Sequence, residues 1–134
     1  MIKYKAGYKY QLTKTSITKV NIKPLIAIDI ERIRLTEKGA LVIRKGYCWD
    51  GPSGPAIDTK NFMRGSLIHD ALYQLMRMEL LGQEFRDDAD EELRKICLED
   101  GMSKIRAWWV YKAVRGFAKR SALPENKRKE LTAP

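Results

Sequence analysis

The chain has 134 residues, of which 44% are apolar and 32% are charged, and a formal net charge of +9. This length allows one domain with one core and is too short for two. No apolar run approaches the roughly 20 residues needed to cross a bilayer. The N-terminus alternates lysine with tyrosine, where a secretion signal would carry an apolar segment. We therefore expect a protein made and kept inside a cell, unless it leaves within a particle or through lysis.

The charge is unevenly distributed along the chain. Residues 1–45 hold 11 Lys and Arg against 3 acids (+8), residues 46–101 hold 6 against 12 (−6), and residues 102–134 hold 9 against 2 (+7). The two basic flanks can hold the protein close to phosphate groups, whether of lipid, nucleic acid or an enclosed genome. A basic surface that is merely solvated is an equally good interpretation.

The two cysteines, Cys48 and Cys97, are too few for a secreted domain stapled by disulfides. They also form no Cys-x-x-Cys pair of the kind that structural zinc sites use. Because free cysteine is usually a small buried side chain, we expect two free, buried thiols. One isolated disulfide between them is the alternative.

The first third of the chain predicts a small antiparallel sheet. Residues 8–13 alternate well enough for a strand, and residues 24–35 alternate apolar with polar side chains, with one slip in phase at 31–32. A turn at residues 36–39, in which Gly39 supplies the positive φ of a short hairpin, leads into a partner strand at Ala40–Ile43.

A Gly/Pro-rich segment and three helices come next. Residues 46–58 contain three glycines and two prolines, which exclude a helix or a central strand. From Asn61 the apolar period becomes helical, and Gly82 is the expected C-cap of this first helix. A second helix is predicted over roughly 85–99 and a third from about 103 to 120. The first helix is expected to share one apolar face among Phe62, Gly65, Ile68, His69, Leu72 and Met76.

These patterns predict an α+β fold with an N-terminal β-hairpin or small sheet, a Gly/Pro loop and three helices, two of them antiparallel. We expect a single domain over residues 1–121, with the sheet in 1–45, the loop in 46–60 and the helical part in 61–121. The charged segment 122–134, punctuated by proline, is expected to be a loose tail.

The helical period also predicts which faces are buried. In the second helix, which Gly101 stops, these are Phe85, Ala89, Leu93, Ile96 and Cys97. In the third they are Ile105, Trp108, Phe117 and either Tyr111 or Lys112. The pair Trp108 and Trp109 also suits a membrane interface, but we expect one indole in the core and the other half-buried.

Two further groups of residues have structural interpretations. The methionines could line an acyl channel, but we expect them to fill gaps in the core: Met63, Met76 and Met78. Four acids are expected on a solvated face of the second helix, where negative charge in the first turn favours the helix dipole: Asp87, Asp88, Glu91 and Glu92.

His69 is the only histidine of the chain. Tyr73 lies four residues on, one turn further along the same side of the helix, and an antiparallel second helix would bring Asp90 within reach. An imidazole held by a carboxylate is the usual general base near pH 7. We therefore predict a separation of about 2.7–3.2 Å between His69 and Asp90. The alternative is a packed histidine that only holds the helices together.

The Gly/Pro loop can form a second wall of this site. Asp70 projects about 100° away from His69 around the helix, so it can face the loop at residues 50–55. Glycine lets backbone groups approach an ion or oxyanion closely, and carboxylates and carbonyls are ligands of hard cations. A purely structural turn is the alternative.

Four segments resemble, in order and spacing, the motifs of a family common in bacteriophages and prophages, catalogued as domain of unknown function 1353. The likeness covers roughly residues 24–118. The segments are Asp50-Gly51-Pro52-Ser53-Gly54-Pro55, His69-Asp70-Ala71-Leu72-Tyr73, Arg86-Asp87-Asp88-Ala89-Asp90 and Tyr111-Lys112-Ala113-Val114-Arg115-Gly116-Phe117. The resemblance implies a phage-type protein of the bacterial cytoplasm or the virion, with Ser53 and Arg86 as further candidate site residues, and it brings no established activity.

A looser resemblance is to the phospholipase A2 group, including the lipase segment of parvoviral capsids. That group has a glycine-rich calcium loop, an HDxxY helix and a carboxylate early in the next helix, and here the matching segments read SGPAID, HDALY and ADEEL. The resemblance implies that His69 activates the attacking water, that Asp90 orients His69, and that Tyr73 hydrogen-bonds Asp90.

The same resemblance implies a calcium ion. Asp70 would bind it together with loop carbonyls near Gly51 and Gly54, and Asp50 would be an extra ligand or a turn cap. The disulfides of the group are absent here, as in its parvoviral branch, and the two prolines of the loop limit how it can wrap an ion.

The leading hypothesis is a phage-type accessory protein whose His–Asp site hydrolyses phospholipid with calcium. One rival is a non-enzymatic virion or host-interaction protein, in which the same side chains form a polar network that fixes helix packing. Another is a protein that associates with nucleic acid through its basic flanks. The corresponding partners are anionic lipid, virion components and nucleic acid, and the sequence leaves substrate and oligomeric state open.

Overall fold

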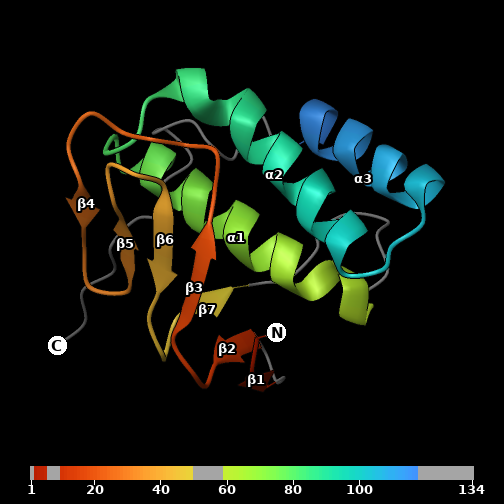
Figure 1. The fold of residues 1–134 in the computed structure, drawn as a ribbon, viewed down its shortest axis with the longest axis horizontal. Helices are drawn as coiled ribbons and strands as arrows, with labels where there is room; N and C mark the ends of the chain where they lie inside the picture. The colour runs from red at the N-terminus through yellow and green to blue at the C-terminus, as the bar shows by residue number, and fades with distance from the viewer. Residues whose placement is uncertain (1, 6–9, 50–58, 118–134) are drawn as a thin grey trace, which may run out of the picture.

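The computed structural model describes residues 2–5, 10–49 and 59–117. These residues form two antiparallel sheets and three α-helices, which confirms the expected α+β fold (Figure 1). One sheet has the strand order β1-β2-β7 and the other β3-β6-β5-β4. The strands are β1 (Tyr4–Lys5), β2 (Tyr10–Leu12), β3 (Ser16–Lys19), β4 (Ile28–Asp29), β5 (Ile33–Leu35), β6 (Ala40–Ile43) and β7 (Cys48–Trp49). The predicted tail at 122–134 lies outside the described residues.

The predicted strand at 24–35 is wrong as one continuous element. It is two strands, β4 and β5, which pair antiparallel with Ile28 opposite Leu35. The slip in phase that the sequence shows is the turn between them. Arg44 stabilises this turn, because its Nη1 donates to the carbonyl of Ile30 at 2.6 Å.

The turn at residues 36–39 is confirmed. Gly39 has φ = +88°, and its N–H donates to the carbonyl of Thr36 at 3.0 Å. A Cβ at Gly39 would lie 2.5 Å from the carbonyl oxygen of Val20. Glycine is therefore required here both for its φ and for the close approach of the neighbouring chain.

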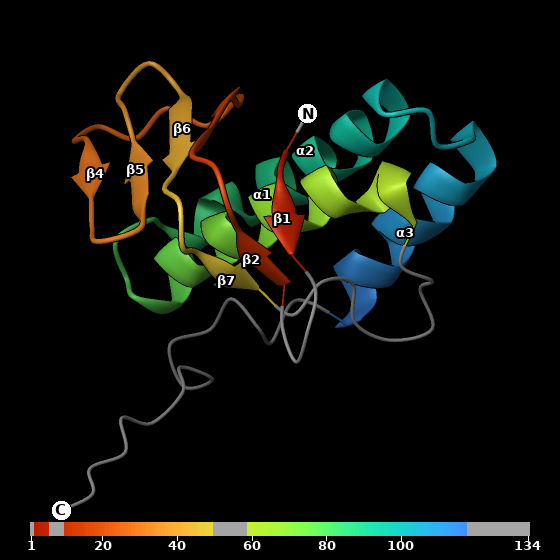
Figure 2. The same cartoon turned by 90° about the horizontal axis from the view of Figure 1, so that it is seen from below.

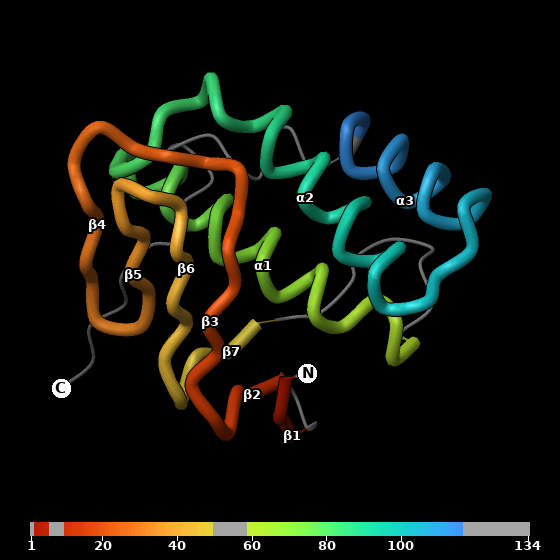
Figure 3. Tube along the Cα trace, viewed as in Figure 1, coloured from red at the N-terminus to blue at the C-terminus, as the bar shows by residue number. Residues whose placement is uncertain are grey.

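The three predicted helices are confirmed as α1 (Lys60–Arg77), α2 (Arg86–Glu99) and α3 (Lys104–Phe117), with a 3₁₀ turn η1 (Gln83–Phe85) before α2. Figures 1 and 3 show α2 running back along α1, and α3 packed on α2 at the end of the molecule away from β4. Figure 2 shows the same order from below. Arg64 near the start of α1 pairs with Asp100 at the end of α2, Nη2 to Oδ1 at 3.0 Å, as an antiparallel pair requires.

Gly82 is not the C-cap of the first helix, which ends earlier than expected. Glu79 adopts φ = +60°, and the N–H of Leu80 donates to the carbonyl of Leu75 at 2.9 Å. This is the hydrogen bond of a Schellman ending, formed here with glutamate at the position where glycine is usual. Gly101 ends α2 as predicted, with φ = +97°.

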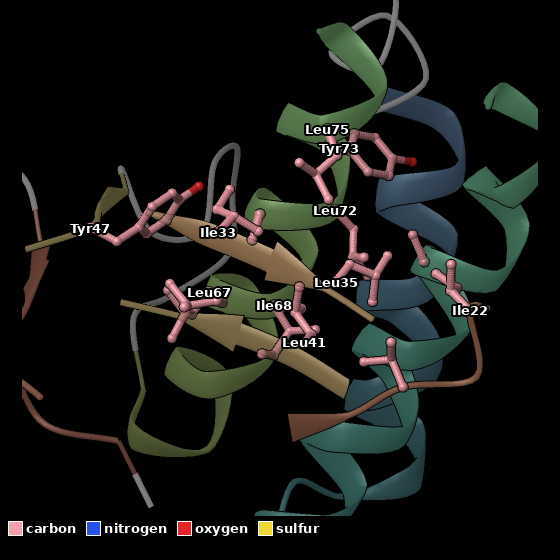
Figure 4. Close-up of a cluster of buried hydrophobic side chains, with 14 of the residues drawn as sticks. Ile22, Ile33, Leu35, Leu41, Tyr47, Leu67, Ile68, Leu72, Tyr73 and Leu75 are labelled. Carbon is pink, nitrogen blue, oxygen red and sulfur yellow. The ribbon is translucent and has the colours of Figure 1, made fainter. Parts of the chain in front are cut away.

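The main core lies between the sheets and α1. Figure 4 shows its side chains gathered between strands and α1, with Tyr73 at one side. Trp49 of β7 is buried, and its Nε1 donates to Oγ of Ser66 on α1 at 3.1 Å, which fixes the short strand to the helix. A second cluster joins α1, α2 and α3 through Phe62, Leu93, Cys97, Met102, Ala107 and Val110.

The predicted buried face of α3 is wrong. Ala107 and Val110 are buried, whereas Ile105, Trp108 and Trp109 are exposed. Both sides of α3 carry apolar residues, so periodicity alone could not choose between them, and the smaller side chains pack against α2. Tyr111 is half-buried and Lys112 is exposed, while the side chain of Phe117 lies outside the described part of the chain.

Three smaller predictions are also corrected by the structure. Cys48 is exposed while Cys97 is buried, and both are free thiols. Glu92 is buried, because its Oε1 accepts the N–H of Asn21 at 2.7 Å. Phe85 is only half-buried beside the core. The expected place of the methionines in the core is confirmed for Met63 and Met76, which are buried. Met78 is only half-buried.

No helix in the described ranges is both long enough and apolar enough to span a membrane.

Candidate functional site

The candidate site lies between α1 and α2. His69 and Tyr73 are one turn apart on α1 and face α2, where Asp90 lies. One cause of the close packing is Gly65, because a Cβ there would lie 2.9 Å from both Sγ of Cys97 and Cδ1 of Leu93. The absence of that side chain lets the two helices approach until a histidine and an aspartate can touch.

Asp90 is the centre of the site. Its Oδ1 lies 2.7 Å from Nε2 of His69 and accepts the hydroxyl of Tyr73 at 2.6 Å. Its Oδ2 accepts Nη1 of Arg115 at 2.8 Å. The predicted contacts of His69 and Tyr73 with Asp90 are therefore both confirmed. The imidazole also packs against the phenol, with ring centroids 4.1 Å apart.

The site is closed to solvent at Asp90, whose side chain is fully buried, while that of His69 is 7% exposed. Burial by itself would raise the pKa of the Asp90 carboxyl, but hydrogen bonds from His69, Tyr73 and Arg115 outweigh it and lower that pKa. Burial and the hydrogen bond to Asp90 raise the pKa of Tyr73. At neutral pH the site therefore contains a carboxylate and a neutral phenol.

A charged carboxylate at this distance determines the tautomer of the imidazole. Because Asp90 has only acceptors to offer, Nε2 of His69 carries the proton that is shared with Oδ1. The described residues offer this ring no other hydrogen bond, so in the neutral ring Nδ1 holds a lone pair. An imidazole in this state can accept a proton from a water molecule.

Arg115 is the site residue that the sequence interpretation missed. It comes from α3 and pairs with Oδ1 of Asp87 at 2.5 Å as well as with Asp90. The available signal was its place in the tyrosine- and arginine-bearing third-helix segment of the phage-family resemblance. Its contact with Asp90 depends on how α3 packs on α2, which the sequence did not predict.

The remaining predicted residues lie around this centre or beyond the described ranges. Asp70 is half-buried and makes further interactions of its own. Arg86 is half-buried at the start of α2, where its positive charge acts on Tyr73, and its Nε has no hydrogen-bond partner among the described residues. The predicted loop residues Asp50, Gly51, Ser53 and Gly54 lie outside the described residues.

Two observations on the described residues concern the binding of small ligands and of metal ions. A cavity of about 360 Å³ lies beside β3 and the start of α1, lined by Lys3, Lys14 and Arg64 among others and by none of the four residues of the site. In the ranges that the structure describes, no group of three or more histidine, cysteine or acidic side chains could hold a metal ion.

No protein-family model, curated protein or solved structure matches the chain.

Proposed function

We propose that the chain is a phage-type accessory protein that hydrolyses an ester bond, with His69 as the general base. The observation that carries the proposal is the 2.7 Å separation between Nε2 of His69 and Oδ1 of Asp90. This carboxylate contact leaves Nδ1 as the proton acceptor. The substrate class that accompanies the phospholipase A2 resemblance is the phospholipid ester.

Each residue has a defined task in this mechanism. Nδ1 of His69 takes a proton from water as the water oxygen attacks the ester carbonyl carbon, and the imidazolium then returns the proton to the departing alcohol oxygen. Asp90 holds the ring in the required tautomer and stabilises the imidazolium. Tyr73 and Arg115 hold the carboxylate in place through its two oxygens.

The calcium ion that the resemblance implies would polarise the ester carbonyl. Of its proposed ligands, only Asp70 belongs to the described residues, and one carboxylate does not make a calcium site. The described residues thus do not by themselves fit the ion, and the mechanism contains no step through it.

The test is release of fatty acid from vesicles of mixed phosphatidylglycerol and phosphatidylcholine, with and without millimolar calcium. The proposal expects release by the parent protein and none by His69→Gln, because an amide cannot accept a proton at neutral pH. An inactive parent under both conditions would contradict it.

The burial of the site favours a second candidate, a non-enzymatic virion or host-interaction protein in which these residues only hold the helices together. Asp90 is fully buried and its oxygens bridge α1 and α3 to α2. In that case His69→Gln would lower the free energy of unfolding by about 1–3 kcal/mol and leave the biological role intact.

A further inference from the structure

α3 exposes Ile105 and both of its tryptophans. Ile105 is 74% exposed, Trp108 43% and Trp109 64%. Residues three and four apart lie on one side of a helix, so these side chains form one stripe, which Lys112 continues a turn further on. We call these four residues the outer face of α3. Within the described ranges, Ala107 and Val110 already supply the contacts of α3 with α2, so the packing of this helix does not require the indole pair.

The charge that α3 itself carries is positive. The sequence of α3, KIRAWWVYKAVRGF, contains four basic residues and no acid. Two of the basic residues, Lys104 and Lys112, are exposed, and Nζ of Lys112 lies 5.5 Å from the ring centroid of Trp108. The indoles themselves are in edge-to-face contact, with centroids 5.3 Å apart. The outer face thus combines aromatic surface with ammonium groups at its margin.

We propose that the outer face of α3 docks onto an anionic lipid bilayer. Indole rings prefer the boundary between headgroups and acyl chains, because one part of the ring is apolar and its N–H can stay hydrated. A helix with an apolar stripe flanked by lysines lies in the plane of such an interface, and the ammonium groups are attracted to lipid phosphates. The residues of this face can dock onto lipid whether or not His69 catalyses hydrolysis.

The area of the face favours lipid over a second copy of the chain. The two indoles together expose about as much surface as one whole tryptophan, roughly 250 Å². Ile105 is a smaller side chain, and its exposed area is less than that of the two indoles. A stable protein interface needs about 800 Å² from each partner. Two like faces would also bring Lys104 and Lys112 close to their counterparts, whereas an anionic membrane attracts all of them.

The experiment is co-sedimentation of the full chain with vesicles of phosphatidylglycerol and phosphatidylcholine, against vesicles of phosphatidylcholine alone. The parent should bind the anionic vesicles, and salt should weaken this binding. Trp108→Ser with Trp109→Ser should lower the partition coefficient roughly tenfold or more. The matched control is Leu25→Ser with Ile26→Ser, a pair that is even more exposed but distant in sequence from α3, and it should bind like the parent.

The contribution of charge is tested in the same assay. Lys104→Glu with Lys112→Glu should weaken binding more than Lys19→Glu with Lys38→Glu, which makes the same change in net charge at exposed sites elsewhere. Circular dichroism melting verifies that each variant is folded. His69→Gln should bind like the parent, so a failure of hydrolysis and a failure of docking are distinguishable.

Three results would overturn the proposal. They are equal binding to both kinds of vesicle, equal loss in the Leu25/Ile26 control, and a dimer of the parent in sedimentation velocity that the Trp108/Trp109 variant abolishes. The last result would assign the face to a second copy of the chain.

Discussion

Nη1 of Arg115 lies 2.8 Å from Oδ2 of Asp90, so α3 supplies the positive charge for a carboxylate that is fully buried on α2. The opposite oxygen of the same carboxylate holds His69 and Tyr73 of α1. One aspartate thus connects three helices, and its charge affects both the stability of the fold and the tautomer of the histidine.

Arg115→Met should destabilise the protein by about 1–3 kcal/mol, because it leaves a buried carboxylate without its ionic partner. The matched control is Asp87→Asn, which removes the other ion pair of Arg115. The side chain of Asp87 is 72% exposed. That change should cost less than about 1 kcal/mol. Urea unfolding of the two variants measures the difference, and equal losses would contradict the importance assigned to Asp90.

The free energy of unfolding should decrease as the pH falls, and this decrease should be smaller in Asp90→Asn than in the parent. The pKa of Asp90 is lower in the folded state than in the unfolded chain, so the folded state binds its proton less readily. The resulting stability is present above the ordinary carboxyl pKa of about 4 and is lost as the pH falls through the lowered value. Urea midpoints from pH 6 to pH 2 should drop less steeply for Asp90→Asn than for the parent. Parallel curves would show that another group causes the acid sensitivity.

The two cysteines should differ in reactivity. Cys48 is exposed, whereas burial raises the pKa of the Cys97 thiol to about 12, and the thiolate is the reactive form. Titration with a thiol reagent at pH 8 should give one fast-reacting thiol in the native protein and two after denaturation without reductant. Two fast thiols in the native state would contradict the burial of Cys97, and none after denaturation would indicate a disulfide.

Gly65→Ala tests the close approach of α1 and α2. The new Cβ would meet Leu93 and Cys97 at 2.9 Å, and such overpacking costs about 1–3 kcal/mol. Gly116→Ala is the control, because no atom of the described residues lies within 4 Å of its Cβ position on α3. That change should be neutral or stabilising by up to about 1 kcal/mol. Thermal melting compares the two, and a harmless Gly65→Ala would mean that the helices can separate at no cost.

The sequence predicted the features that depend on local pattern. The helical period located all three helices, Gly39 located the hairpin turn, and an antiparallel second helix predicted the contact of His69 with Asp90. The hydrogen bond from Tyr73 to Asp90 was implied only by the phospholipase A2 resemblance. The antiparallel direction of α2 could be predicted, because a connection of only a few residues places two successive helices side by side in opposite directions.

What the sequence could not show depends on tertiary packing. Arg115 meets Asp90 only because α3 packs through Ala107 and Val110, and periodicity could not distinguish that face from the opposite, equally apolar face with Trp108. Glu79 takes the left-handed position that the sequence assigned to Gly82, because the hydrogen bonds that end α1 form without glycine. Buried Glu92 looked solvated because its partner, the N–H of Asn21, lies 71 residues away.

The most direct test of catalysis at His69 compares fatty-acid release by His69→Gln and Tyr73→Phe, each expressed per folded molecule. Both variants change a side chain that hydrogen-bonds the same oxygen of Asp90, so a purely structural role predicts similar behaviour for the two. A general base at His69 predicts a loss of at least about 100-fold in His69→Gln, while Tyr73→Phe keeps most of the activity of the parent. Equal rates for the two folded variants would contradict the assignment of His69 as the general base.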